Sequence, residues 1–220
     1  KEARQQLKAK KQATAKACNF DFYALLTPDL TLCERYLPDF DAPNDKFWIA
    51  VKSYKGTGKN YFQHELASKV YRDRGLPVLY VTQLTNLINQ EAKAMGLVSI
   101  HELVKSSGQL RHQLTIEAMK NGLACTLDSF HKIKVLIPNF VPFLTFFDEA
   151  ESGCEAVLDA STAIANHRTE SIACIRELMR VSKAKYADAH AYLFDSDLTN
   201  ISVDWFTSLT GDDAYIVHNT

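Results

Sequence analysis

The sequence of 220 residues has no apolar run of about 18 or more residues, the length that a membrane-spanning helix needs, and no recognisable signal peptide. The sequence also lacks an excess of positive or negative charge. The formal net charge is −1, so contact with nucleic acid would require a local basic surface. The five cysteines are scattered and contain no C-x-x-C pair, which argues against a disulfide framework or a zinc site. We therefore expect a reduced, cytoplasmic protein without a membrane partner.

The hydrophobic content of 46% is sufficient for one large domain with a substantial core. The chain begins at Lys1 without Met and ends at Thr220, so we expect a fragment of a longer protein. The predicted organisation is a lead-in over residues 1–44 and one main domain over residues 45–220. The following histidines show no metal-ligand spacing and are expected to be structural or surface residues: His64, His101, His112, His167 and His190.

The lead-in has two parts. Residues 1–16 are rich in Ala, Gln and Lys, with Glu2 as the single acid, which is typical of a solvated linker helix or of a basic arm that touches nucleic acid. We favour the linker, because no aromatic residues are interleaved with the charges. Residues 18–44 mix aromatics with prolines, which prevents a long helix. We expect a packed segment with a short strand at residues 30–32; stacking on an adenine base is the alternative.

A glycine-bearing loop at residues 53–60 is the feature around which the main domain is organised. An apolar run over residues 47–51 precedes the loop and a helical pattern follows it, which is the context of a phosphate-binding P-loop. Gly56 and Gly58 would let successive backbone N–H groups face the phosphates, and Lys59 would reach the terminal ones. Two positions depart from G-x-x-x-x-G-K-[ST]: Ser53 replaces the first Gly, and Asn60 replaces the hydroxyl residue that binds Mg²⁺. An ordinary turn between a strand and a helix is the alternative.

Apolar segments alternate with helical patterns along the rest of the domain, which predicts an α/β fold with a mainly parallel sheet and helices on both faces. We expect residues 98–113 to be a variable excursion and residues 133–141 to be connecting sequence. The expected strands are 45–51, 78–81, 123–127, 143–147, 189–194 and 215–218. The expected helices are 60–74, 87–95, 100–105, 110–119, 161–185 and 201–209.

Acidic residues follow the apolar run over residues 143–147. A carboxylate at the tip of a buried strand is costly unless it holds a cation or accepts hydrogen bonds, so Asp148 is a candidate Mg²⁺ ligand. Glu149 is then placed to orient or deprotonate a hydrolytic water. A helix N-terminus carrying acids is the alternative, but the upstream P-loop favours a nucleotide site. Other polar groups are expected at the same carboxyl edge of the sheet, namely Lys59, Thr82, Ser129 and Asp195.

The ordered set SYKGTGKN, VTQLTNL, CTLDSFHKI, FFDEAES, YLFDSDL and DAYIVHN resembles the first RecA-like lobe of a superfamily 2 helicase. It is most similar to origin-binding helicases and to the helicase module of cyanobacterial plasmid replication proteins. The resemblance covers about residues 45–220 and implies a plasmid- or phage-encoded protein that acts on DNA in replication initiation. It implies that ATP is bound by Ser53, Lys55, Gly56, Thr57, Gly58, Lys59 and Asn60, with Mg²⁺ at Asn60 and Asp148.

The resemblance implies further roles. Lys59, Asp148 and Glu149 would be catalytic, while Gln83, Thr85, Ser129 and His131 would face the nucleic-acid strand. The resemblance implies that this strand is single-stranded DNA or origin DNA. Asp195, Ser196 and Asp197 would couple hydrolysis to strand movement.

Two features of the sequence bear on activity. Tyr54 replaces a Pro, which alters loop stiffness, and Asn60 offers Mg²⁺ an amide oxygen in place of a hydroxyl. Superfamily 2 helicases also place arginine fingers on a second lobe, so this chain alone is expected to hydrolyse ATP poorly. A scaffold that binds nucleotide and DNA without unwinding is the first alternative. A small-molecule kinase is a further one, against which a water-activating Glu149 argues.

Overall fold

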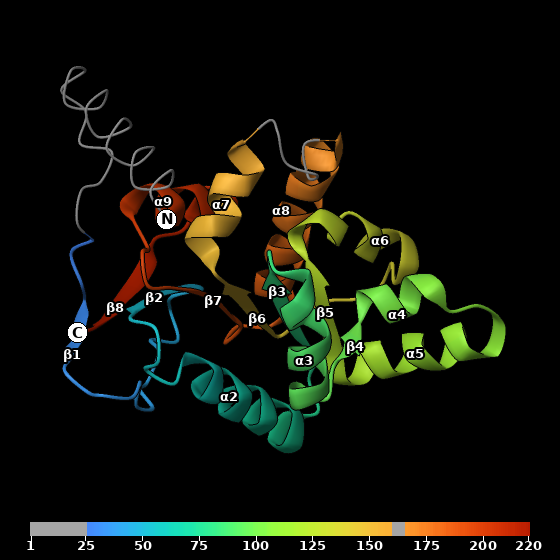
Figure 1. Cartoon of the computed structure of the whole chain (residues 1–220), viewed down its shortest axis with the longest axis horizontal. Helices are drawn as coiled ribbons and strands as arrows, with labels where there is room; N and C mark the ends of the chain where they lie inside the picture. The colour runs from blue at the N-terminus through green and yellow to red at the C-terminus, as the bar shows by residue number, and fades with distance from the viewer. Residues whose placement is uncertain (1–25, 160–165) are drawn as a thin grey trace.

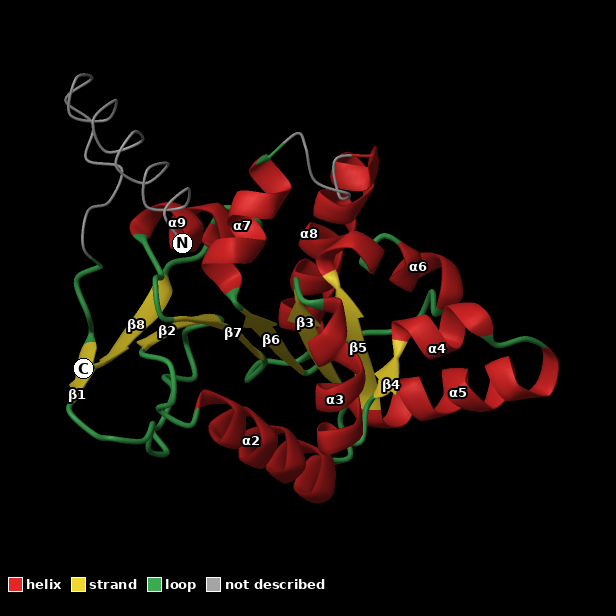
Figure 2. Cartoon of the chain, in the orientation of Figure 1, coloured by secondary structure: helices red, strands yellow, loops and turns green. Residues whose placement is uncertain are grey.

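The computed structural model describes residues 26–159 and 166–220, so the helix predicted over residues 1–16 lies outside the described residues. An eight-stranded, all-parallel sheet forms the centre, in the order β1-β8-β2-β7-β6-β3-β5-β4, and it confirms the predicted α/β class (Figures 1 and 2). The strands are β1 Leu30–Leu32, β2 Trp48–Ser53, β3 Val78–Thr82, β4 Val98–Ser99, β5 Gly122–Thr126, β6 Leu144–Asp148, β7 His190–Asp195 and β8 Ala214–Asn219.

Helices cover both faces of this sheet. Figure 2 shows α2 and α3 on one side of the sheet and α7, α8 and α9 on the other. None of the described helices is long and apolar enough to cross a membrane. The helices are α2 Lys59–Arg74, α3 Thr85–Met95, α4 Ile100–Lys105, α5 Gly108–Asn121, α6 Lys132–Leu136, α7 Ala150–Leu158, α8 Arg168–Lys185 and α9 Asn200–Thr207, with a 3₁₀ turn at Leu127–Ser129.

Several sequence-based boundaries were wrong; in addition, the helix α7 over Ala150–Leu158 was not expected. The expected excursion over residues 98–113 contains β4, which pairs with β5 at the edge of the sheet. The connecting sequence after residue 132 contains the short helix α6. Helix α3 begins at Thr85, two residues earlier than expected, since Thr82 ends the preceding strand. Short elements of two to five residues carry too little periodicity to be recognised from sequence.

The sheet core explains why the apolar runs become strands. Trp48 through Val51 are fully buried, because a parallel strand covered by helices on both faces has no solvent side. The polar group of Trp48 is also satisfied, since its indole N–H donates to Thr210 Oγ1 at 2.7 Å. A rigid, dry strand therefore leads into the glycine loop and fixes where that loop begins.

Gly122 shows how closely two strands approach. A Cβ on this residue would lie 1.9 Å from the carbonyl oxygen of Val78, and its φ of +124° is a conformation that L side chains rarely adopt. Only glycine can therefore start β5 in its register beside β3.

The described part of the lead-in packs on the main domain, as predicted. β1 pairs with β8, and the ring of Phe40 stacks on Phe62 of α2 at a centroid distance of 5.2 Å. Tyr36 differs, because its side chain remains 58% exposed while its ring lies beside Gly58 of the glycine loop. An exposed aromatic ring therefore lies next to the loop, with the guanidinium carbon of Arg35 5.3 Å from its centroid.

Candidate nucleotide-binding site

The glycine loop joins β2 to α2 and is internally braced. Gly56 and Gly58 have φ values of +83° and +75°, which turn the backbone where a side chain would be strained. Thr57 Oγ1 donates to the Tyr54 carbonyl at 2.6 Å and lies 2.7 Å from Ser53 Oγ. The Leu37 N–H donates to the Thr57 carbonyl at 2.7 Å, which ties the lead-in to the loop. The loop thus has the backbone shape expected for a phosphate cradle.

Lys59 is the first residue of α2 and its side chain folds back over this loop. Its Nζ donates to the carbonyl oxygens of Ser53 at 2.7 Å and Tyr54 at 3.2 Å. Partial burial lowers the pKa of Lys59, and the carboxylates of Asp148 and other acids oppose that shift. An anion arriving at the loop would replace two neutral carbonyls as the partner of this ammonium group, which strengthens the contact.

The strand order places the predicted acids at the same edge. β7 lies between β2 and β6, and all three strands are parallel, so their carboxyl ends meet. Asp148 is the last residue of β6 and is buried. Its Oδ2 accepts from Tyr80 Oη at 2.8 Å and its Oδ1 from Gln63 Nε2 at 3.3 Å. Burial raises the pKa of Asp148, and these two hydrogen bonds act in the opposite direction.

Glu149 has an unusual backbone. Its φ of +55° makes it the single non-glycine residue with positive φ among residues 26–159 and 166–220. Burial raises the pKa of Glu149, and the neighbouring carboxylates of Asp195 and Asp148 raise it further. Left-handed backbone at a non-glycine residue is costly and is concentrated at functional sites. Glu149 therefore combines a strained backbone with a raised pKa at the carboxyl end of β6.

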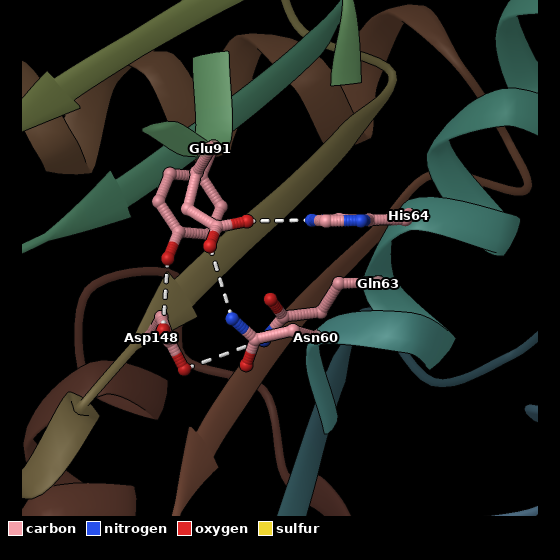
Figure 3. A network of polar contacts seen from close by, with 6 residues as sticks. Asn60, Gln63, His64, Glu91 and Asp148 are labelled. Atoms are coloured by element: carbon pink, nitrogen blue, oxygen red, sulfur yellow. Dashed lines mark hydrogen bonds and ion pairs between the residues drawn. The ribbon is translucent and has the colours of Figure 1, made fainter. Parts of the chain in front are cut away.

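Asn60 belongs to a polar network that Figure 3 shows. Its Nδ2 donates to Glu91 Oε1 at 3.0 Å, and His64 Nε2 lies 2.5 Å from Glu91 Oε2. Sequence reasoning missed Glu91, Gln63 and Tyr80. A signal existed for Gln63 alone, because it lies one helical turn after Asn60 and so shares its face of α2.

These residues also allow a test of whether Mg²⁺ fits. The available donors at the site are oxygens, from Asn60 and Asp148, which is the class that Mg²⁺ prefers. Gln63 Oε1 is buried and has no hydrogen-bond partner among the described residues, so a water would satisfy it. No group of three or more His, Cys, Asp or Glu in the described residues is arranged to hold a metal. Two oxygen donors are compatible with Mg²⁺, which usually keeps several water molecules as ligands.

The segment after β7 is tied to the acidic segment after β6. Asp195 Oδ2 accepts from the Glu151 N–H at 3.0 Å, and its Oδ1 accepts from the Asp197 N–H at 3.0 Å. The Glu151 carboxylate in turn accepts from the Thr199 N–H at 3.0 Å and from the Thr199 hydroxyl. The partly buried Ser196 lies inside this turn. Hydrogen bonds therefore join the two segments directly.

The residues predicted to face nucleic acid differ in exposure. Thr85 is exposed and Gln83 is half-buried at the carboxyl end of β3, beside the exposed Leu84. Ser129 is buried. His131 stacks on His167 at a centroid distance of 4.2 Å, and burial lowers the pKa of His131.

No family model and no curated protein matches the chain. Solved structures do. The DUF1998 helicase MrfA bound to DNA and AMPPNP is 16% identical with a TM-score of 0.51, covering 78% of this chain and 24% of that chain. This chain therefore has an α/β fold of the RecA-like type. The helicase domain of Pyrococcus furiosus Hef is 14% identical with a TM-score of 0.52, covering 80% of this chain and 35% of that one.

A third neighbour is Mss116p bound to ssRNA and AMP-PNP, with 13% identity, a TM-score of 0.50, and coverage of 79% of this chain and 36% of that one. This chain therefore spans between 24% and 36% of the length of these three chains. At such low sequence identities, these neighbours are evidence for the fold alone. The narrower resemblance to origin-binding helicases and plasmid replication proteins stays a prediction.

Proposed function

We propose that the chain is the ATP-binding lobe of an ATP-dependent DNA helicase that acts in replication initiation. The observation that carries the proposal is the strand order β2-β7-β6, which sets the glycine loop and the acidic segment at one edge of a RecA-like sheet. Ligands bind at the carboxyl edge of such sheets. Asp148 ends β6 and Glu149 follows it directly, while Lys59 begins α2 after the loop that leaves β2.

In this proposal the backbone N–H groups of residues 53–60 and the N-terminus of α2 bind the triphosphate. Lys59 leaves the carbonyls of Ser53 and Tyr54 and binds the terminal phosphates. Asn60 and Asp148 would hold Mg²⁺, which supplies positive charge that neutralises the phosphate oxygens. The exposed ring of Tyr36 is available to stack on the base.

Hydrolysis requires a base near the terminal phosphate. Glu149 accepts a proton from the attacking water, and its raised pKa brings it closer to the working pH of a general base. Asp195 and Glu151 then connect the acidic segment to the loop before α9, which is the route by which hydrolysis would reach the strand-moving element formed with Ser196 and Asp197.

DNA is the proposed partner, supported by the resemblance and by the neighbour MrfA, which was solved with DNA. Mss116p was solved with ssRNA, so the neighbours leave the choice between DNA and RNA to the resemblance. Thr85 and Gln83 are positioned at the surface for contact with the strand, and His131 would act from the adjoining turn. A second RecA-like lobe of the longer protein would supply the arginine fingers.

The second candidate is a module that binds nucleotide and DNA as a scaffold without efficient hydrolysis. The observation in its favour is Asn60, whose amide bonds Glu91 at a position where a small hydroxyl would bind the metal. Mg²⁺ requires near-ideal octahedral geometry, which a bulkier amide meets less readily.

Steady-state ATP hydrolysis separates the two candidates. We expect hydrolysis by the chain to rise on addition of poly(dT), to be lost in Glu149→Gln, and to increase several-fold in Asn60→Thr. Substrate binding in Glu149→Gln serves as the control for folding. If the chain binds ATP while poly(dT) has no effect and Asn60→Thr stays inactive, the helicase lobe is excluded in favour of the scaffold. A chain that binds no nucleotide contradicts both.

A further inference from the structure

Glu91 is a buried carboxylate with an unusual position. It lies on α3, is only 1% exposed, and reaches the first turns of α2 (Figure 3). A buried carboxylate is costly unless each oxygen has a partner. Both do: His64 Nε2 lies 2.5 Å from Oε2, and Asn60 Nδ2 donates to Oε1 at 3.0 Å. Because Asn60 and His64 are four residues apart, they project from one face of α2 and hold Glu91 between them.

This arrangement determines which way the amide of Asn60 points. The two ends of an amide are chemically opposite, since the nitrogen only donates and the oxygen only accepts. An ionised carboxylate has no proton to donate, so it can be approached only by the nitrogen end. The oxygen of Asn60 must therefore face away from Glu91. Figure 3 shows it on the side of the network on which Asp148 lies.

His64 makes this orientation durable. Its Nε2 contacts Oε2, the second oxygen of Glu91, which prevents the carboxylate from rotating toward another donor. Asn60 itself is exposed, so its oxygen remains open to a ligand at the loop. A threonine at position 60 would need no such guide, because a hydroxyl both donates and accepts.

We infer that Glu91 is a positioning residue, which turns the amide oxygen of Asn60 toward the nucleotide side so that Asn60 serves as a metal ligand in place of the usual hydroxyl. This inference rests on the proposed ATP site. Asn60 on α2 would then depend on a second residue, Glu91 on α3, to orient its side chain for the metal.

The experiment compares ATP affinity with Mg²⁺ and with EDTA, by calorimetry, in the whole chain. The dissociation constant in EDTA divided by that in Mg²⁺ measures the contribution of the metal to ATP binding. We expect Glu91→Gln to reduce this ratio about 10-fold, the lower end for loss of a partner that orients a metal ligand. The affinity in EDTA should change less than about 2-fold. Glu65→Gln removes a carboxylate charge from α2 instead of α3. It is the matched control and should leave the ratio unchanged.

Two further variants keep the test decisive even if Glu91→Gln folds poorly. Asn60→Ala changes an exposed residue and should reduce the ratio by the same factor. In an Asn60→Thr background, Glu91→Gln should have no effect on the ratio, because the hydroxyl needs no orientation. A merely structural role of Glu91 would instead lower the ratio in both backgrounds.

The outcomes separate this inference from the function on which it rests. Wild-type chain that binds ATP in a Mg²⁺-dependent way, with the ratio preserved in Asn60→Ala, overturns the inference alone. The same follows if Glu91→Gln reduces the ratio equally in the Asn60→Thr background. Wild-type chain that binds no ATP under either condition overturns the proposed ATP site, and the inference with it.

Discussion

Glu151→Gln is the substitution that most directly probes the connection between the acidic segment and the loop before α9. The Glu151 carboxylate accepts from the Thr199 N–H at 3.0 Å and from the Thr199 hydroxyl at 3.0 and 3.1 Å. Glutamine keeps the shape but removes the charge and one acceptor. Hydrogen bonds to charged groups contribute about 1.5–3 kcal/mol. Burial raises the pKa of Glu151, so desolvation offsets part of this gain and we expect a loss of about 1.5 kcal/mol.

Urea denaturation followed by circular dichroism measures this loss directly. For a chain of this size it corresponds to a decrease in Tm of roughly 3–6 °C. Glu155→Gln is the control, since Glu155 is exposed on the same helix and should change stability by less than about 0.5 kcal/mol. ATP affinity should be retained in Glu151→Gln while stimulation of hydrolysis by poly(dT) decreases. Equal stability of the two variants would refute the reasoning.

Three more substitutions test separate parts of the account. Folding raises the pKa of Asp148 above its ordinary 3.8, so the folded state holds that proton more tightly and loses stability as pH rises through the raised value. Asp148→Asn should therefore have a higher Tm than wild type at pH 8, and the difference in Tm should narrow toward pH 4. A difference in Tm that is independent of pH would contradict this. Tyr36→Ala should weaken ATP binding about 10-fold, the effect of one lost stacking contact, and leave tripolyphosphate binding unchanged; equal losses for both ligands would exclude base stacking. Gly122→Ala should destabilise by more than about 3 kcal/mol because its Cβ would overlap the Val78 carbonyl, whereas Gly75→Ala, with φ +62° and open space, should cost only about 1 kcal/mol, and similar urea midpoints would disprove the steric argument.

Local patterns were enough to predict the glycine loop and the alternation of strands and helices. A continuous apolar run such as Trp48–Val51 has few alternatives to a strand buried on both faces. Gly56 and Gly58 likewise indicate a turn, because glycine readily adopts positive φ. The parallel sheet followed from the spacing between strands, since each connection is long enough to hold a helix. Asp148 and Glu149 were placed correctly at a strand end for the same reason.

The partners of the site residues could not be predicted from sequence. Asn60 and Glu91 are 31 residues apart, and Tyr80 and Asp148 are 68 apart, so their contacts depend on how α3 and β3 lie beside the loop. No spacing rule connects positions on different elements. Strand β4 was missed because two residues carry no period. The burial of Ser129 could not be predicted either, because this residue lies in a short 3₁₀ turn that has no recognisable sequence pattern.

Binding of ATP with Mg²⁺ by calorimetry, in wild-type chain and in Lys59→Ala, tests the central claim most directly. The ammonium group of Lys59 lies over the glycine loop and is the one cation of that loop held by two backbone carbonyls among the described residues. The account predicts measurable binding by wild-type chain and a loss of at least about 10-fold in the variant, as expected for removal of a charge-assisted contact. Equal binding by both proteins, or binding by neither, would contradict a phosphate site at this loop.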